Sequence, residues 1–164
     1  MEINSSNEAD PVTGFTQREK YLVTSSFELV KKDMVGAGTR LFMNLFEQKP
    51  EYQEYFSFKD IPRKDLPNSP KFKAHAVTVM YALSSFIANL DETDIFMHLL
   101  KKNANSHIQK HIPAEAFDFV PKILVNIIKE IFGSKIDEEG VNAWNKVLTV
   151  AFKVITDTIK NANE

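Results

Sequence analysis

Apolar residues recur every three or four positions along most of the chain, which is the spacing of helices that bury one face. The first such run begins at Thr16, where a capping box with Glu19 predicts a helix start, and it extends to about Lys32. A second run predicts a helix that ends before Pro50, and Pro50 opens a short further turn of helix. The second stripe consists of Val35, Gly38, Leu41, Phe42, Leu45 and Phe46.

Residues 56–68 contain two prolines and scattered charges in place of a periodic pattern, so this segment is expected to be a long corner with a short or absent helix. Ser69 and Pro70 then suit the cap and first residue of a long helix. Further helical stripes run from residue 93 to Pro113, from there to residue 132, and from about Asp137 onward. The pattern predicts six or seven helices, no strand and one packed all-α domain.

Pro121 falls inside the helix expected between residues 113 and 132. A proline in a helix interior lacks an N–H donor and clashes with the preceding turn, at a cost of about 3 kcal/mol. We therefore expect a kink at Pro121, with a late start of the helix as the alternative.

The polar N-terminal stretch divides the chain into unequal parts. Residues 1–14 lack apolar periodicity and are expected to be a flexible extension, followed by one domain over 15–160 and a short tail over 161–164. The N-terminus is acidic and has no apolar run, and no stretch approaches the length of a membrane span, so a cytoplasmic location is expected.

Charge and composition exclude several kinds of chemistry. The net charge of −2 gives no basic footprint, so neither nucleic acid nor an anionic membrane is expected as a partner. The chain has no cysteine, which excludes disulfides, thiolate nucleophiles and cysteine-ligated metal centres. A metal would therefore need histidine, carboxylate or methionine ligands.

Three of the four histidines fall on the predicted inward faces, namely His75, His107 and His111. A neutral imidazole is a good donor to iron or zinc. Each histidine taken alone also fits a hydrogen-bonded core residue, and the Phe-rich stripes fit plain core packing. His107 and His111 have the i, i+4 spacing of a two-histidine zinc site, but no glutamate follows His107 as in the metalloprotease motif.

Three segments together resemble the globin family, in its myoglobin- and cytoglobin-like members. The segment LFMNLFEQKPEYQEYF (41–56) is similar to the family's second and third helices, HAVTVMYAL (75–83) to the distal helix, and SHIQKHIP (106–113) to the proximal turn. The resemblance extends from Thr16 to about Ile159 and implies an invertebrate or tissue globin. It implies the globin fold, with six to eight helices around one haem pocket and a short or absent fourth helix.

The resemblance assigns two histidines to haem b (iron protoporphyrin IX). His107 is implied to be the proximal iron ligand. His75 is implied to be the distal histidine, which either donates a hydrogen bond to a gas ligand or binds the iron itself.

The resemblance implies five further residues around the cofactor. Phe56 is implied to pack on the haem at the corner, Phe42 to face His75 in the distal pocket, and Val79 to lie over the iron. Ser106 is implied to orient the other nitrogen of His107, and His111 to contact a haem propionate.

The resemblance implies reversible dioxygen binding for storage, transport or buffering. The alternative is a bis-histidyl, six-coordinate globin in redox, nitric oxide or nitrite chemistry or in sensing, and a haem-free helical interaction module is a third. We expect the protein not to be an enzyme, apart from a secondary nitric oxide dioxygenase or nitrite reductase activity. The expected partners are dioxygen and other diatomic gases and a reductase, and the chain is expected to be a monomer or a homodimer.

Overall fold

The computed structural model describes residues 8–164, and residues 1–7 of the expected extension lie outside this part. The described chain is helical and contains no strand, as the apolar periodicity predicts. The α-helices are α1 (Gln17–Val30), α2 (Met34–Gln48), α3 (Pro70–Ala88), α4 (Thr93–Ile108), α5 (Val120–Phe132) and α6 (Glu138–Ala162). Short 3₁₀ helices cover Lys31–Asp33, Pro50–Tyr55, Arg63–Asn68, Ala114–Phe117 and Gly133–Lys135.

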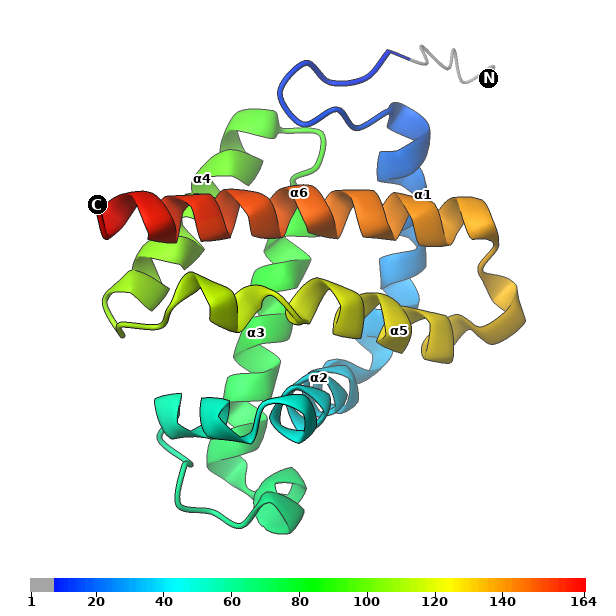
Figure 1. Ribbon diagram of the computed structural model, residues 1–164. Coiled ribbons are helices and arrows are strands. Elements are labelled where there is room, and N and C mark those ends of the chain that lie inside the picture. Colours follow the sequence, from blue (N-terminus) through cyan, green and yellow to red (C-terminus); the bar gives the residue numbers. More distant parts are fainter. Residues whose placement is uncertain (1–7) are drawn as a thin grey trace.

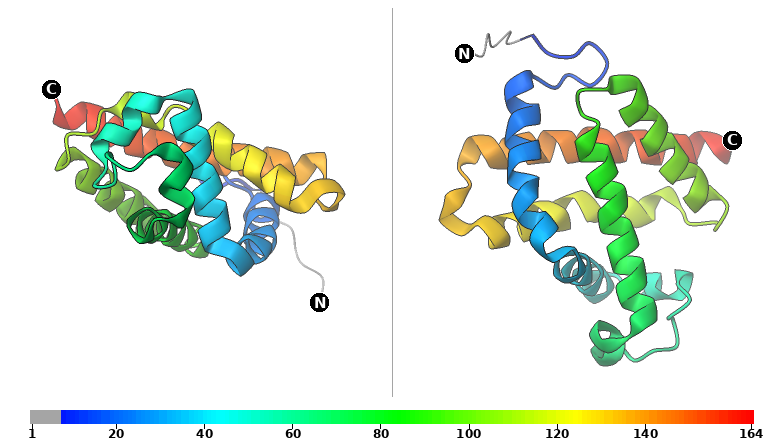
Figure 2. Two further views of the ribbon diagram at one scale, coloured as in Figure 1. Left: turned by 90° about the horizontal axis from the view of Figure 1, so that it is seen from below. Right: turned by 180° about the vertical axis from the view of Figure 1, so that it is seen from behind.

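The helices form two crossing layers. Antiparallel α5 and α6 lie side by side in one layer, and α1 and α3 cross behind them at a steep angle (Figure 1). Viewed from behind, α3 lies between α1 and α4, and α2 passes behind the lower half of α3 (Figure 2, right). Steep crossings of this kind are typical of ridge-into-groove packing, and they leave space for a ligand between the layers.

Helices α2 and α3 cross closely at Gly38. A Cβ atom at this position would lie only 2.5 Å from the carbonyl oxygen of Ala76, which is backbone and has no room to move aside. Gly38 therefore fixes how closely α3 approaches α2. The apolar face predicted for this helix is buried from Gly38 to Phe46, as expected. Val35 at its start is 40% exposed, because it lies in the first turn of α2 on the outer side.

Local signals set the starts of several helices. The capping box of Thr16 and Glu19 is present at the start of α1, and the Ser69 hydroxyl accepts a hydrogen bond from the Phe72 amide at the start of α3. The short 3₁₀ turn over Arg63–Asn68 stands where a fourth helix was expected to be short or absent.

The expected kink at Pro121 is wrong, because the helix starts late. The segment after Pro113 first forms the short turn Ala114–Phe117, and α5 begins only at Val120. Pro121 then lies in the first helical turn, where its missing N–H would have no intrahelical partner and its fixed φ suits the helix.

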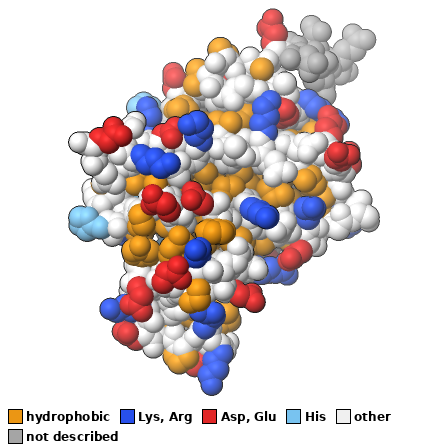
Figure 3. All heavy atoms as spheres, in the orientation of Figure 1, with side chains coloured by type: hydrophobic (Ala, Val, Ile, Leu, Met, Phe, Trp, Pro, Cys, Tyr) orange, Lys and Arg blue, Asp and Glu red, His pale blue; other side chains and the backbone are white. Residues whose placement is uncertain are grey.

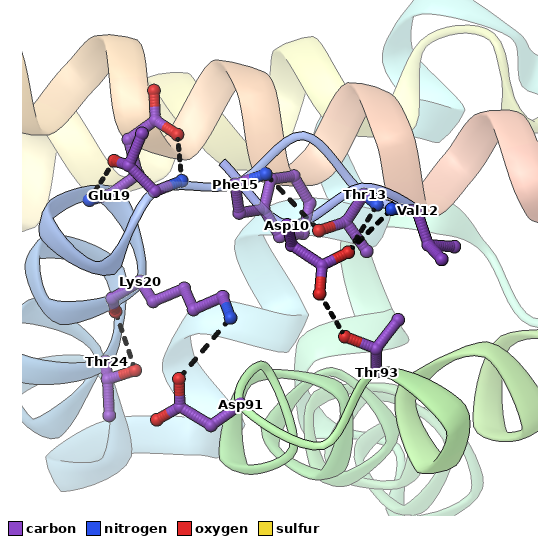
Figure 4. A network of polar contacts seen from close by, with 10 residues as sticks. Asp10, Val12, Thr13, Phe15, Glu19, Lys20, Thr24, Asp91 and Thr93 are labelled. Carbon is purple, nitrogen blue, oxygen red and sulfur yellow. Dashed lines mark hydrogen bonds and ion pairs between the residues drawn. The ribbon is translucent and has the colours of Figure 1, made fainter. Parts of the chain in front are cut away.

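The N-terminal residues next to α1 are held to a distant part of the chain. Asp10 accepts hydrogen bonds from the Thr13 amide (2.8 Å) and from the Thr93 hydroxyl at the start of α4 (2.7 Å), as Figure 4 shows. Buried Lys20 extends beside this turn and forms an ion pair with Asp91 at 3.5 Å. Residues 10–14 thus form a fixed turn where the sequence suggests a flexible extension. The division of the chain into 1–14, 15–160 and 161–164 stays a prediction.

Across residues 8–164, no helix is both long enough and apolar enough to cross a bilayer. The cytoplasmic location stays a prediction.

Candidate functional site: a two-histidine cavity

A cavity of about 330 Å³ lies between the two layers, at the crossing of α2, α3, α4, α5 and α6. Its volume lies within the range of small-molecule and cofactor sites, and most of its lining side chains are apolar. Five of the site residues expected from the sequence line it, namely Phe42, Phe56, His75, Val79 and His107. Residues far apart in the sequence therefore meet around one space, as the resemblance implies.

His107 lies at the C-terminal end of α4, and one of its ring nitrogens is bound to the backbone. Nδ1 lies 2.8 Å from the carbonyl oxygen of Asn103, one turn earlier in the same helix. Because a carbonyl can only accept, Nδ1 carries the proton and Nε2 keeps a free lone pair. The Phe117 ring packs edge-on against the imidazole, with ring centroids 4.9 Å apart, and fixes its plane.

His75 lies within a cluster of phenylalanine rings. Its ring centroid is 4.8 Å from those of Phe42 and Phe56 and 5.9 Å from that of Phe58. Within the described chain, its nitrogens have no protein hydrogen-bond partner, so the plain interpretation of His75 as a satisfied core histidine loses its support. An imidazole held by apolar contacts alone is free to interact with a ligand in the cavity.

Burial keeps both imidazoles neutral. Loss of hydration lowers the pKa of His75 from 6.5 to about 4, and the nearby Lys110 ammonium and His107 act in the same direction. Burial also lowers the pKa of His107, although the hydrogen bond to Asn103 opposes this effect. Both rings can therefore offer a nitrogen lone pair at neutral pH.

The end of α4 differs from what the resemblance implies. Ser106 and His111 are both exposed and are not among the residues that line the cavity, so their assigned roles stay predictions. The carbonyl of Asn103, and not the Ser106 hydroxyl, accepts from His107. Lys110 does line the cavity, and because it lies beyond the end of α4 at Ile108, helical spacing from His107 did not indicate it.

The backbone explains why His111 turns away. The helix ends at Ile108, and His111 adopts a φ of +56°, a left-handed conformation that is uncommon for residues other than glycine. The helical i, i+4 rule therefore does not place His111 on the same face as His107. The i, i+4 zinc pair considered from the sequence accordingly does not form on one helical face.

The corner that carries Phe56 is held by a residue that the sequence pattern did not indicate. The side-chain amide of buried Gln53 donates to the carbonyls of Phe58 (3.2 Å), Lys59 (3.3 Å) and Ile61 (2.9 Å). These bonds stabilise a loop without regular structure, and they hold Phe56 and Phe58 against His75. No local sequence signal marks Gln53, because its role depends on where the loop backbone places these carbonyls.

The donor set fits an iron that brings its own equatorial ligands. Among residues 8–164, no group of three or more His, Asp or Glu side chains could hold a bare metal ion. Two neutral imidazoles in an apolar cavity offer only two nitrogen donors, so an iron held by them would need its remaining ligands from a flat macrocycle. Its hydrophobic faces match the phenylalanine and aliphatic lining.

The chain belongs to the globin family, whose sequence profile, described as Globin, matches residues 39–155. A chain named Globin-2 B chain from Anadara inaequivalvis is 31% identical over 132 residues, which cover 80% of this chain and 87% of that one. The hexacoordinated heme protein from an anhydrobiotic tardigrade, solved at pH 4, has the same fold at a TM-score of 0.86 and 19% identity, over 93% of this chain and 99% of that one. Haem is the cofactor of this family, and diatomic gases are its ligands.

The comparisons correct one expectation. A relative from Solanum lycopersicum that is named an anaerobic nitrite reductase is 33% identical over 138 residues, which cover 81% of this chain and 87% of the relative. A protein this similar carries the name of an enzyme, so the expectation that the chain is not an enzyme is wrong. The family resemblance that implied reversible dioxygen binding does not distinguish a carrier from a catalyst.

Proposed function

We propose that this globin holds haem b between His107 and His75 and that it binds dioxygen reversibly. The hydrogen bond between His107 Nδ1 and the Asn103 carbonyl is the observation that carries the proposal. It leaves Nε2 as the donor and raises its basicity, as outer-sphere partners of metal-binding histidines do. When bound, haem would supply an iron that can bind a gas ligand.

The surroundings of His75 support the same role. Phe42 and Phe56 exclude water from one side of its ring, and Val79 lines the cavity one helical turn further along α3. A neutral imidazole N–H in an apolar space can donate a hydrogen bond to a polarised gas molecule, and it discriminates in this way against carbon monoxide.

Direct binding of His75 to the iron is the second candidate. Two observations favour it: the ring has no protein hydrogen-bond partner within the described chain, and its lowered pKa keeps a lone pair available at neutral pH. A globin closed by two histidines suits redox, nitric oxide or nitrite chemistry, and the similarity to a relative named nitrite reductase is in line with this role. An external reductant would then be required.

The visible spectrum of the haem-loaded protein, reduced under argon, separates these candidates. One broad visible band would support five-coordinate iron and reversible dioxygen binding, and exposure to oxygen should then give a stable new spectrum. Two sharp bands would support His75 as the second axial ligand. His75→Leu should convert the second spectrum to the first, while the matched variant His98→Leu, at an exposed histidine of α4, should change neither. Absence of haem uptake would overturn the proposal and leave the haem-free module.

A further inference from the structure

A second hollow lies on the outer face of the molecule, between α5 and α6, and encloses about 640 Å³. We call it the α5–α6 groove. Its apolar base includes Val125, Val141, Phe117 and Phe152, and polar or charged side chains stand along its edges. Figure 3 shows this face, with a strip of hydrophobic atoms between the two helices and charged groups beside it.

The groove is basic although the whole chain is slightly acidic. It is lined by four lysines but only two aspartates. Lys153 is paired with Asp157 at 2.6 Å, whereas Lys122, Lys129 and Lys160 have no ion-pair partner among the described residues. The three unpaired lysines outnumber the one unpaired aspartate, Asp118, and around an apolar strip they favour a partner whose own contact face is acidic at its rim and apolar at its centre.

The base of the groove is also the wall of the two-histidine cavity. Phe117 and Phe152 line both spaces, with ring centroids 6.3 Å apart. Phe117 in turn packs against His107 at 4.9 Å. Phe117 therefore connects the groove with the His107 imidazole through direct ring contact.

We propose that the α5–α6 groove docks an acidic one-electron carrier protein, which holds a flavin or an iron–sulfur cluster and reduces haem iron in the adjoining cavity. This inference rests on the proposed function, because it presupposes haem on His107. The step transfers one electron: the carrier is oxidised by one electron, ferric iron becomes ferrous, and no covalent bond forms or breaks. The lysines position the carrier, and Phe117 and Phe152 provide the contact between the two sites.

The observations favour a protein partner over a lipid surface or a nucleic acid. The basic region is a groove between two helices with aspartates among its lysines, whereas membranes and phosphate backbones bind broad, uniformly basic faces. Charge attraction speeds the encounter of proteins mainly at low salt, so the docking should depend strongly on ionic strength.

The test compares two charge-reversal variants. The groove variant carries K122E, K129E and K160E, and the matched control carries K71E, K101E and K102E, three exposed lysines of α3 and α4 that do not line the groove. The probe is a plant-type [2Fe–2S] ferredoxin, chosen for its net negative charge and its low reduction potential. Reduction of the ferric protein is followed by stopped flow, and binding by titration of fluorescently labelled ferredoxin.

We expect wild-type reduction to slow by about tenfold or more when ionic strength rises from about 0.02 to 0.5 M. The groove variant should lose about tenfold in both rate and binding at low salt and should show little salt dependence, while the control should change less than about threefold. Dithionite, a small reductant, should reduce all three proteins equally, which shows that the haem site is intact.

Equal behaviour of the groove variant and the control would overturn the inference while leaving the proposed function intact. Binding of wild type to phosphatidylserine vesicles that the groove variant loses, with unchanged ferredoxin rates, would also overturn it and assign the groove to a membrane. If haem is not taken up at all, the proposed function fails. Titration of the haem-free chain with ferredoxin still reports whether the groove docks the carrier.

Discussion

His107 Nδ1 and the carbonyl oxygen of Asn103 lie 2.8 Å apart within the last turns of α4. The bond links the orientation of the imidazole to the helix backbone and not to a neighbouring side chain. Since every residue has a carbonyl, the contact persists whatever side chain occupies position 103. The backbone of α4 itself therefore orients the His107 imidazole.

Replacement of His107 by glycine should abolish stable haem binding. The variant removes the donor but leaves a space that free imidazole can fill, so we expect haem retention to fall by more than about 100-fold and added imidazole to restore the spectrum. Transfer of haem to an apo-globin acceptor measures this directly. His98→Gly, an exposed histidine in the same helix, should behave as wild type, and loss of haem in both variants would instead indicate a disrupted α4.

Gly38→Ala should destabilise the protein by about 1–3 kcal/mol, because the added methyl group meets the backbone of Ala76 and forces α2 and α3 apart. The midpoint of urea unfolding measures this effect. Gly140→Ala in α6 is the matched control, since its added methyl meets only side-chain atoms of Ile136 and Asp137 and no backbone. Equal unfolding midpoints for the two variants would contradict the close crossing.

Asp10→Asn should lower stability at neutral pH but not near pH 2. Hydrogen bonds from the Thr93 hydroxyl and the Thr13 amide lower the pKa of Asp10 from 3.8 to about 2. A carboxylate whose pKa is lowered by folding stabilises the folded state above its unfolded pKa, and this contribution is lost as pH falls through the folded pKa. After allowance for solvent screening, it is about 1 kcal/mol.

The difference in unfolding free energy between wild type and Asp10→Asn, measured at several pH values, tests this effect. It should be constant from pH 7 to about 5, fall by roughly half at pH 3 and approach zero near pH 2. A difference that does not change between pH 6 and pH 3 would show that the turn is held by contacts other than the Asp10 charge.

His111→Gly should raise stability by about 1 kcal/mol, because glycine adopts a φ of +56° without the steric cost that a side chain carries. His111→Ala removes the same imidazole but keeps that cost, so it should not stabilise. Thermal unfolding of the two variants separates backbone strain from side-chain loss. Because His111 is exposed, we expect haem retention to be unchanged in both, and a marked loss in both would instead support a propionate contact.

The inward direction of His75 and His107 could be predicted from the sequence because helical periodicity is local. His75 lies three residues after Phe72 on one face of α3, and both residues fall on the same side whatever the rest of the chain does. The caps at Thr16 and Ser69 are equally local, and the structure confirms them.

Features that join distant segments could not be read from periodicity. The bond from Thr93 to Asp10 spans 83 residues, and the corner bonds of Gln53 depend on where the loop backbone places its carbonyls. The late start of α5 at Val120 was weighed as an alternative, but sequence alone could not choose between it and a kink. That choice depends on how the segment after Pro113 packs.

The sequence by itself determined the helices, their apolar faces and the two inward histidines, because each depends on contacts within a few residues. Only the tertiary structure decided that Lys110 lines the cavity while His111 leaves it, since a single left-handed residue changes the chain direction there. It alone also brought Phe117 and Phe152 between the cavity and the α5–α6 groove. The physical reason is that helix periodicity fixes which face of a helix is buried, whereas the crossing of helices decides which buried faces meet.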